Sequence, residues 1–459
     1  MKILKIVFAL VISMIMSFTT VSMAQENDSI SRIELSKNII DSFKIELVKD
    51  SESSFGDVKA EDLEYVYTIV DNKIASGYGE SFKPDKGVTN EEAMTMIVRA
   101  MGEEKFAQKM DTEHIELVYD EKVSDWARPY VVYCIEKGII EYGSDIDPSA
   151  ILTKENCDSM IKNGAEYYNK ELKRDGLTVY DMLDKAGQNM LEKKTYKATT
   201  NMDITSTTKS EEEGTDDTVI NMNKVQEVQF EEPETVYTKD TTIMKNPETD
   251  EEMTMTSEVY MKDRIMYIKA DGQAKWTKMD MNPMMNELQS MMGSSMNTST
   301  LTKEQLDIFG MYAKYEADEK IEGKDYYVVS IDIDDESFKE IVKMIADKAT
   351  EIAAANVEAT ENKDKKNIDE FIDDSDNQEM VKEIIDTIIE NVKMDINCKY
   401  YIDKETKIYD KIKMEMDMNM NFMGMNNEAK VTAESKYHDF GEKMEFPEIS
   451  EDDVESMDL

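Results

Sequence analysis

Residues 414 to 422 alternate between apolar and polar side chains, and this pattern limits what the chain can fold into. The apolar members are Met414, Met416, Met418, Met420 and Phe422. Glu415, Asp417 and Asn419 stand between them. Because alternate residues of a β-strand share one face, the segment is expected to be a strand with a thioether face and a polar face. The thioether face must pack against something apolar.

The same period of two recurs along the second half of the chain and predicts a sheet. The expected strands are Tyr196–Thr208, Val219–Phe230, Val236–Met244, Met253–Met261, Ile265–Ala270, Trp276–Met281, Tyr312–Ala317, Tyr326–Ile333, Asp395–Asp403, Lys407–Gly424 and Ala429–Phe440. Methionines recur in several of them, at positions 202, 222, 244, 253, 255, 261, 266, 279 and 281. Such a sheet has one apolar and unusually pliable face.

Three interpretations of that face remain open. Helices can pack against it, with methionine filling the gaps. Alternatively, the face lines a cavity for a lipid or another apolar ligand, since unbranched methionine adapts to varied shapes. Copper(I) binding by thioethers is a third interpretation, and the absence of a His/Cys cluster disfavours it.

Helical periodicity appears beside the strands. Leu177–Lys194, Phe338–Val357 and Met380–Val392 are expected to be helices, with a charged linker at 358–378. Residues 283–312 are rich in Met, Ser, Asn and Thr, and predict a short helix or a flap.

The first part of the chain contains two repeats and a half repeat. They cover about 30–50, 53–102 and 117–165, and Thr89 and Thr153 stand 64 residues apart at matching points. Ser31, Thr89 and Thr153 are each placed as a helix N-cap, and Glu34 follows Ser31 as in a capping box. Gly138 is expected to end a helix in a left-handed conformation.

This arrangement resembles the S-layer homology family. The resemblance rests on Phe55-Gly56-Asp57, Phe82-Lys83-Pro84, Asp125-Trp126-Ala127-Arg128-Pro129-Tyr130 and Lys137-Gly138-Ile139-Ile140. It implies helix pairs around a pseudo-threefold axis that bind acidic wall polysaccharide between repeats. The glycan-binding candidates carried over by position are Arg32, Glu34, Asp57 and Trp126. In the other copies, Asn90 and Lys154 replace the motif arginine. Neither side chain can bind a carboxylate through two parallel hydrogen bonds as arginine does, so the resemblance implies glycan binding by these copies less strongly.

The region 178–449 resembles the LolA/LppX-like lipoprotein half-barrel. The resemblance rests on Glu258–Lys262, Met266–Lys269, Trp276–Met279, Tyr401–Thr406 and Phe440–Lys443. It implies a strongly curved antiparallel sheet covered by helices, in a family that carries or senses lipids. The lipobox cysteine of many relatives is missing, so wall docking would replace a lipid anchor.

The N-terminal residues have the pattern of an export signal. Lys2 and Lys5 precede the short apolar run Ile6–Phe18, and Ser22-Met23-Ala24 fits a cleavage site. We expect a signal peptide at 1–24 and a secreted protein at the cell wall or surface. A retained N-terminal anchor helix is the alternative. No later segment is expected to span a membrane.

Charge and cysteine content exclude several classes. The 54 Lys and Arg residues against 99 Asp and Glu residues give a net charge of −45, which repels nucleic acid and keeps an exported protein soluble, or lets divalent cations bridge it to an anionic wall. Cys134 and Cys157 either pair or, as we favour, pack as small buried residues. No metal site, cofactor or catalytic motif is recognisable, so we expect a protein that is not an enzyme.

These features predict a multidomain fold of class α + (α+β). The expected parts are a signal peptide at 1–24, all-helical S-layer-homology-like repeats at 25–170, an antiparallel half-barrel at 178–449 with a helical insertion at about 335–392, and an acidic tail at 450–459. The expected function is wall association through the repeats and binding of a lipid or other apolar ligand by the half-barrel, on the face of Met414, Met416, Met418, Met420 and Phe422. A purely structural surface protein with a filled half-barrel is the alternative.

Overall fold

The computed structural model divides the chain into two units between Lys173 and Arg174. It describes residues 29–51, 53–113, 115–210, 218–232, 234–245, 249, 251–282, 311–340, 342–343, 390–422 and 425–456. The leader, the segment 283–310 and most of the expected helices at 338–357 and 380–392 lie outside these residues. No helix among the described residues has both the length and the hydropathy needed to cross a membrane.

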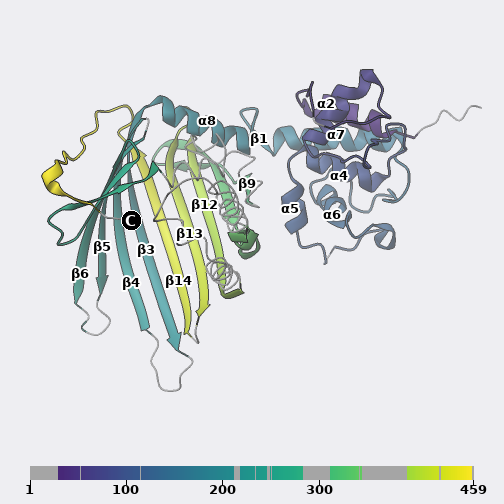
Figure 1. The fold of residues 1–459 in the computed structure, drawn as a ribbon. Coiled ribbons are helices and arrows are strands. Elements are labelled where there is room, and N and C mark those ends of the chain that lie inside the picture. The colour runs from purple at the N-terminus through teal and green to yellow at the C-terminus, as the bar shows by residue number, and fades with distance from the viewer. Residues whose placement is uncertain are drawn as a thin grey trace, which may run out of the picture. The chain divides into compact units, whose positions relative to one another are not determined.

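The N-terminal unit consists of helices (Figure 1), and three of them begin at the expected caps. They are α2 (Arg32–Phe43), η1 (Ala60–Asp62), α3 (Leu63–Asp71), α4 (Asn90–Ala100), α5 (Glu104–Lys109), η2 (Asp120–Lys122), α6 (Arg128–Glu136) and α7 (Lys154–Lys170). Ser31 and Thr89 form capping boxes with Glu34 and Glu92, while Thr153 caps α7 through the backbone N–H of Asn156. Gly138 adopts φ 67°, as its place after α6 predicts.

A closed ring of three backbone hydrogen bonds joins the three capped helices. The N–H of Ile30 donates to the carbonyl of Leu152 at 3.0 Å, that of Leu152 to Val88 at 2.7 Å, and that of Val88 to Ile30 at 3.3 Å. Each of these residues directly precedes an N-cap, and all three are buried. The three copies therefore meet around a pseudo-threefold axis, with their apolar residues at the centre.

Both cysteines of this unit are free. Cys134 and Cys157 are buried, and the amide of Asn38 donates to Sγ of Cys157 at 3.7 Å. Burial raises the pKa of each thiol above its ordinary value, so neither is a ready nucleophile. The expectation that they pack as small buried residues is confirmed, and the disulfide alternative is wrong.

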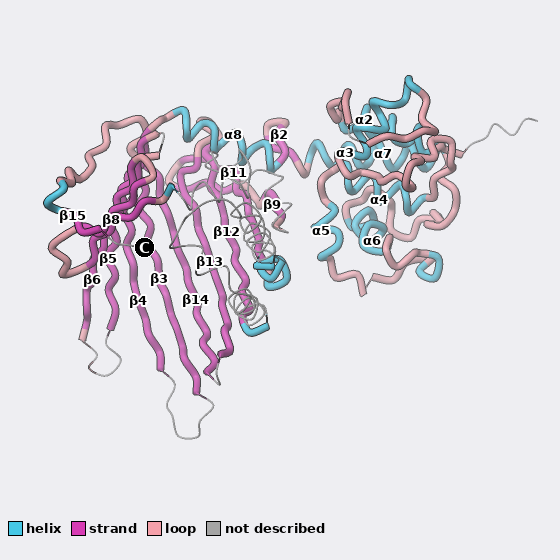
Figure 2. Tube along the Cα trace, viewed as in Figure 1, coloured by secondary structure: helices cyan, strands magenta, loops and turns pink. Residues whose placement is uncertain are grey.

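The C-terminal unit is a curved, open sheet of long strands, shown in magenta in Figure 2. The two-stranded sheet of β1 (Lys173–Arg174) and β2 (Leu177–Thr178) precedes α8 (Val179–Glu192). The main strands are β3 (Thr195–Ser210), β4 (Thr218–Glu231), β5 (Thr235–Lys245), β6 (Glu252–Lys262), β7 (Ile265–Ala270), β8 (Trp276–Asp280), β9 (Tyr312–Tyr315), β10 (Glu319–Ile321), β11 (Lys324–Ile333), β12 (Val392–Asp403), β13 (Tyr409–Phe422), β14 (Met425–His438) and β15 (Val454–Ser456).

The sheet order is β10-β11-β12-β13-β14-β3-β4-β5-β6-β7-β8-β15, with β9 paired to β11. Every pairing is antiparallel except that of β15 with β8. The eleven strands expected from the alternation are all present, and described turns such as Asp263-Arg264 and Asp271-Gly272 join consecutive strands. The first strand and the last long strand, β3 and β14, are neighbours in the middle of the sheet (Figure 1).

Some details differ from the sequence expectation, and others lie outside the described residues. Residues 454–456 form β15 beside β8, because the edge of β8 leaves backbone groups unpaired and a short strand can satisfy them. The expected acidic tail at 450–459 is therefore partly inside the sheet. The helix expected from Leu177 begins instead at Val179, because the Thr178 hydroxyl accepts from the N–H of Asp181 and caps it. The expected insertion at 335–392 is described only at 335–340, 342–343 and 390–392.

Helix α8 packs across one end of the sheet and defines one of its two faces. Met182, Leu183, Ala186 and Met190 are buried against strands β11, β12 and β13. The contacted residues include Tyr327, Val329, Ile331, Ile402 and Tyr409. The hydroxyl of Tyr409 donates to the carbonyl of Leu183 at 2.9 Å. We call the side of the sheet that carries these residues the α8 face.

Candidate functional site

The strand register aligns the apolar residues of the α8 face into continuous rows. One row, which we call the methionine row, crosses eight neighbouring strands. Its members are Ile333, Ile396, Met416, Val431, Ile204, Met222, Met244 and Met253. A second row runs through Met394, Met418, Ala429, Ser206 and Ile220. The thioether face predicted for one strand therefore extends over most of the sheet.

The four predicted ligand-face methionines of β13 all lie on this face. Met414, Met416, Met418 and Met420 are half-buried, whereas Glu415 and Asp417 are exposed on the opposite side. Phe422 ends β13 in register with Met425, but its side chain lies outside the described residues. The α8 core itself reaches Ile333 on β11 and Cys398 on β12. The apolar face thus continues well beyond the area that α8 buries.

A second candidate site lies in the N-terminal unit, around the exposed ring of Tyr78. Three cations surround it: the guanidinium of Arg32 is 5.2 Å from the ring centroid, Nζ of Lys83 is 4.3 Å away and Nζ of Lys86 is 5.4 Å away. Lys86 also donates to the Tyr78 hydroxyl at 3.1 Å and to the Glu92 carboxylate at 2.9 Å. We call these four residues, Arg32, Tyr78, Lys83 and Lys86, the Tyr78 patch. In a chain of net charge −45, it is a local basic surface with an aromatic platform.

Arg32 is the buried member of the patch. It is 6% exposed, lies 4.7 Å above the Phe82 ring centroid, and its Nη2 donates to the carbonyl of Ser76 at 2.6 Å. Its Nε is buried and has no hydrogen-bond partner among the described residues. Burial lowers the pKa of Arg32 from its usual value, yet a guanidinium stays charged at neutral pH.

Glu34 and Asp57 have structural partners. The Glu34 carboxylate accepts from the backbone N–H and hydroxyl of Ser31, which lowers its pKa below the usual range. The exposed carboxylate of Asp57 accepts from the backbone N–H of Phe82 at 2.9 Å and of Lys83 at 2.8 Å, and these bonds lower its pKa. Asp57 therefore holds the turn that carries Lys83, beside the ring on which Arg32 lies.

Trp126 belongs to the second repeat and is 54% exposed. The loop before it is held by Ser124, whose N–H and hydroxyl both donate to the carboxylate of Glu91. Of the four predicted glycan-binding residues, the structure brings Arg32 and Asp57 together around Phe82. Glu34 lies on the first turn of the same helix as Arg32.

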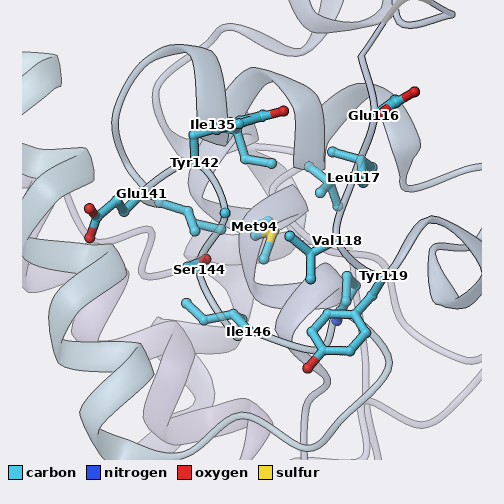
Figure 3. Close-up of a pocket in the computed structure, with 14 residues that line it drawn as sticks. Met94, Glu116, Leu117, Val118, Tyr119, Ile135, Glu141, Tyr142, Ser144 and Ile146 are labelled. Atoms are coloured by element: carbon cyan, nitrogen blue, oxygen red, sulfur yellow. The ribbon is translucent and has the colours of Figure 1, made fainter.

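None of the three equivalent positions of the second repeat carries a cation, and the nearby Lys122 is paired with Asp147 at 2.6 Å. Asn90, Asp147 and Ala150 stand where the Tyr78 patch has Arg32, Lys83 and Lys86, and Asn90 donates to the carbonyl of Asp147 at 2.8 Å. A small pocket of the second repeat lies beside the Tyr142 turn, and its lining includes Met94, Leu117, Val118, Ile135, Ile146 and Tyr142 (Figure 3). They leave a cavity of about 30 Å³, close to the volume of one water molecule. The pocket is too small for a sugar ring, although Val118 and Tyr142 of its lining are 57% and 69% exposed.

Sequence reasoning missed Tyr78, Lys83 and Lys86 as site residues. The turns Gly77-Tyr78-Gly79 and Phe82-Lys83-Pro84 were recognisable as turns. The sequence signal that could have identified them is the difference in charge between the repeats. Lys83 and Lys86 of the first repeat match Asp147 and Ala150 of the second.

Comparison with protein families confirms the resemblance of the first part of the chain. A family model described as the S-layer homology domain matches residues 54–94, which hold most of the first full repeat and most of the Tyr78 patch. A second model, described as a family of unknown function (DUF6612), matches residues 178–369. No curated protein matches the chain.

Several solved structures match the C-terminal region. The lipoprotein LppX of Mycobacterium tuberculosis is 7% identical, with 57% of this chain and 97% of that chain covered at a TM-score of 0.22. A LolA superfamily protein of Nitrosomonas europaea is 9% identical (57% and 92% covered, TM-score 0.16), and LprF of Mycobacterium bovis is 10% identical (59% and 96% covered, TM-score 0.21). The two fold families expected for this region are thus among the matches.

Proposed function

We propose that this chain is an exported, non-catalytic protein of the cell surface. Its N-terminal unit associates with cell-wall polysaccharide, and its C-terminal sheet binds a lipid or another apolar ligand on the α8 face. Export rests on the predicted leader at 1–24. Wall association is supported by the S-layer homology match and by the Tyr78 patch.

The methionine row is the observation that carries the ligand-binding role. Burial of apolar surface contributes roughly 25 cal/mol per Å², so eight aligned apolar residues favour a long apolar occupant strongly. Met253, at one end of the row, is 42% exposed. Methionine side chains adjust to acyl chains of different length, which supports a carrier or sensor more than a filled core.

A fluorescent fatty acid titrated into the purified exported protein tests this role. We expect saturable binding with one probe per chain and a blue-shifted emission, because the probe leaves water for an apolar surface. Emission that rises linearly with probe concentration, without saturation, would contradict the proposal.

The Tyr78 patch supports an acidic polysaccharide as the wall ligand. An aromatic ring stacks on a sugar face, and the surrounding ammonium and guanidinium groups attract carboxylate or phosphate substituents. Arg32 is pre-positioned by Phe82 and Ser76, so little side-chain freedom is lost on binding.

Replacing Tyr78 by alanine is expected to lower retention on purified wall polysaccharide about tenfold, because the stacking platform is lost. The matched control is Tyr142→Ala, at the equivalent position of the second repeat, where the ring is 69% exposed. That control should bind as the unmodified protein does. Equal loss in both variants, or no retention of the unmodified protein, would remove the polysaccharide role.

A further inference from the structure

The α8 face carries almost no charge. Charged residues make up 33% of the chain, and they crowd the opposite face of the sheet. At the α8-face positions of the described strands, from Tyr327 on β11 to Met279 on β8, the register places only two charged residues, Lys224 and Asp240. The other charged residues in register with this face, Lys320, Asp325 and Glu455, lie at the two edges of the sheet, so an ion pair between the edges requires an explanation.

Lys224 and Asp240 form the centre of a small polar cluster on neighbouring strands β4 and β5. Nζ of Lys224 lies 3.0 Å from Oδ2 of Asp240, and the amide of Gln226 donates to Oδ1 of Asp240 at 3.0 Å. The side chains of Lys224 and Asp240 are 27% and 14% exposed. Beside Gln226 on β3, the hydroxyl of buried Thr200 is 2.8 Å from that of Ser435 on β14.

Apolar residues flank this cluster along the strands on both sides. Met222 precedes Lys224 and belongs to the methionine row, while Val228 follows Gln226 and pairs with buried Ala198. A half-buried ion pair in such surroundings is seldom stabilising, because desolvation offsets the attraction, and apolar residues of similar size would serve the fold as well or better. The cluster is therefore better explained by recognition than by stability.

We propose that the Lys224–Asp240–Gln226 cluster binds the polar head group of an amphiphilic lipid whose apolar chain lies along the methionine row. This inference rests on the proposed ligand-binding function and names its ligand class. The cluster offers a donor in Lys224, an acceptor in Asp240 and both in Gln226, and its net charge is zero. It matches a head group that is uncharged overall and carries both donors and acceptors.

An anionic head group fits the cluster poorly, so the fatty-acid probe, a carboxylate, tests the apolar face and not this cluster. Asp240 already neutralises Lys224, and the net charge of −45 repels anions from the whole chain. Two kinds of head group have the required chemistry, a zwitterionic phosphoethanolamine and an uncharged sugar. The ammonium of the first would pair with Asp240, whereas the hydroxyls of the second would share all three side chains.

Native mass spectrometry of the purified exported protein with single lipids tests the inference. The probes are dioleoyl phosphatidylethanolamine, diglucosyl dioleoylglycerol and dioleoyl phosphatidylglycerol, each offered in the same detergent micelles. We expect at least one of the first two to bind about tenfold tighter than the phosphatidylglycerol, and the tighter of the two identifies the head group.

Asp240→Asn should tighten phosphatidylglycerol binding about tenfold, because it frees the Lys224 ammonium. The matched control is Asp417→Asn, which removes a carboxylate paired with Lys430 on the opposite face and should change nothing. A second variant, Lys224→Met with Asp240→Leu, should fold at least as stably and lose the discrimination among lipids.

Equal binding of all three lipids by the unmodified protein, or an equal effect of Asp240→Asn and Asp417→Asn, overturns the head-group site while the acyl-binding function stands. Absence of binding by every lipid and by the fluorescent fatty acid overturns both.

Discussion

Replacing Met222 by glutamate is expected to abolish binding of the fluorescent fatty acid and to lower the unfolding free energy of the C-terminal unit by about 2 to 4 kcal/mol. Met222 stands in the methionine row between Ile204 on β3 and Met244 on β5. A carboxylate there places a charge among apolar side chains and against any acyl chain, and the neighbouring cation Lys224 is already paired with Asp240. Probe titration and chemical denaturation measure the two effects.

The control for this variant is Val225→Glu, three residues along the same strand. Val225 is 38% exposed and lies on the opposite face, where polar residues prevail. It should change stability by less than about 0.5 kcal/mol and leave probe binding intact. If Met222→Glu binds the probe as well as Val225→Glu does, the α8 face is not the binding surface.

Replacing Leu152 by alanine is expected to destabilise the N-terminal unit by about 3 kcal/mol. Leu152 is fully buried, and its backbone both donates to Val88 and accepts from Ile30 in the ring that joins the three capped helices. The cavity left at this centre removes contacts to all three copies. Differential scanning calorimetry should show one transition moved to lower temperature, with the transition of the sheet unchanged.

Ile151→Ala is the control for the ring, since the neighbouring Ile151 is 50% exposed. Its transition temperatures should match those of the unmodified protein within about 2 °C. A shift of the sheet's transition by Leu152→Ala, or no shift at all, would show that the ring is not the core of an independently melting unit.

The sheet was predictable because its signal is local. Alternation along each strand fixes which side chains share a face, and tight turns such as Asp271-Gly272 link successive strands. The order of strands and the register across β3 and β14 join residues more than two hundred positions apart. No local pattern specifies that pairing, so the continuity of the methionine row and the isolation of Lys224 and Asp240 emerged only from the structure.

In the N-terminal unit too, the local features were predictable from the sequence and the long-range contacts were not. Hydroxyl caps at Ser31, Thr89 and Thr153 are local signals and were correctly predicted. The ring through Ile30, Val88 and Leu152 and the cations around Tyr78 depend on loops that meet in space. Motif matching selected Asp57 and Glu34 for ligand binding. In the structure, the carboxylate of Asp57 accepts from the backbone N–H of Phe82 in a turn, and that of Glu34 accepts from the backbone N–H of Ser31 at a helix cap.

The most direct test of the central claim is the intact mass of the protein, purified in its exported form without detergent and measured under native and denaturing conditions. The account predicts a native mass that exceeds the polypeptide mass by one acyl-chain ligand, which Val225→Glu retains and Met222→Glu loses. A native mass equal to the bare polypeptide, together with no uptake of added lipid, would contradict it and leave the sheet as a structural element only.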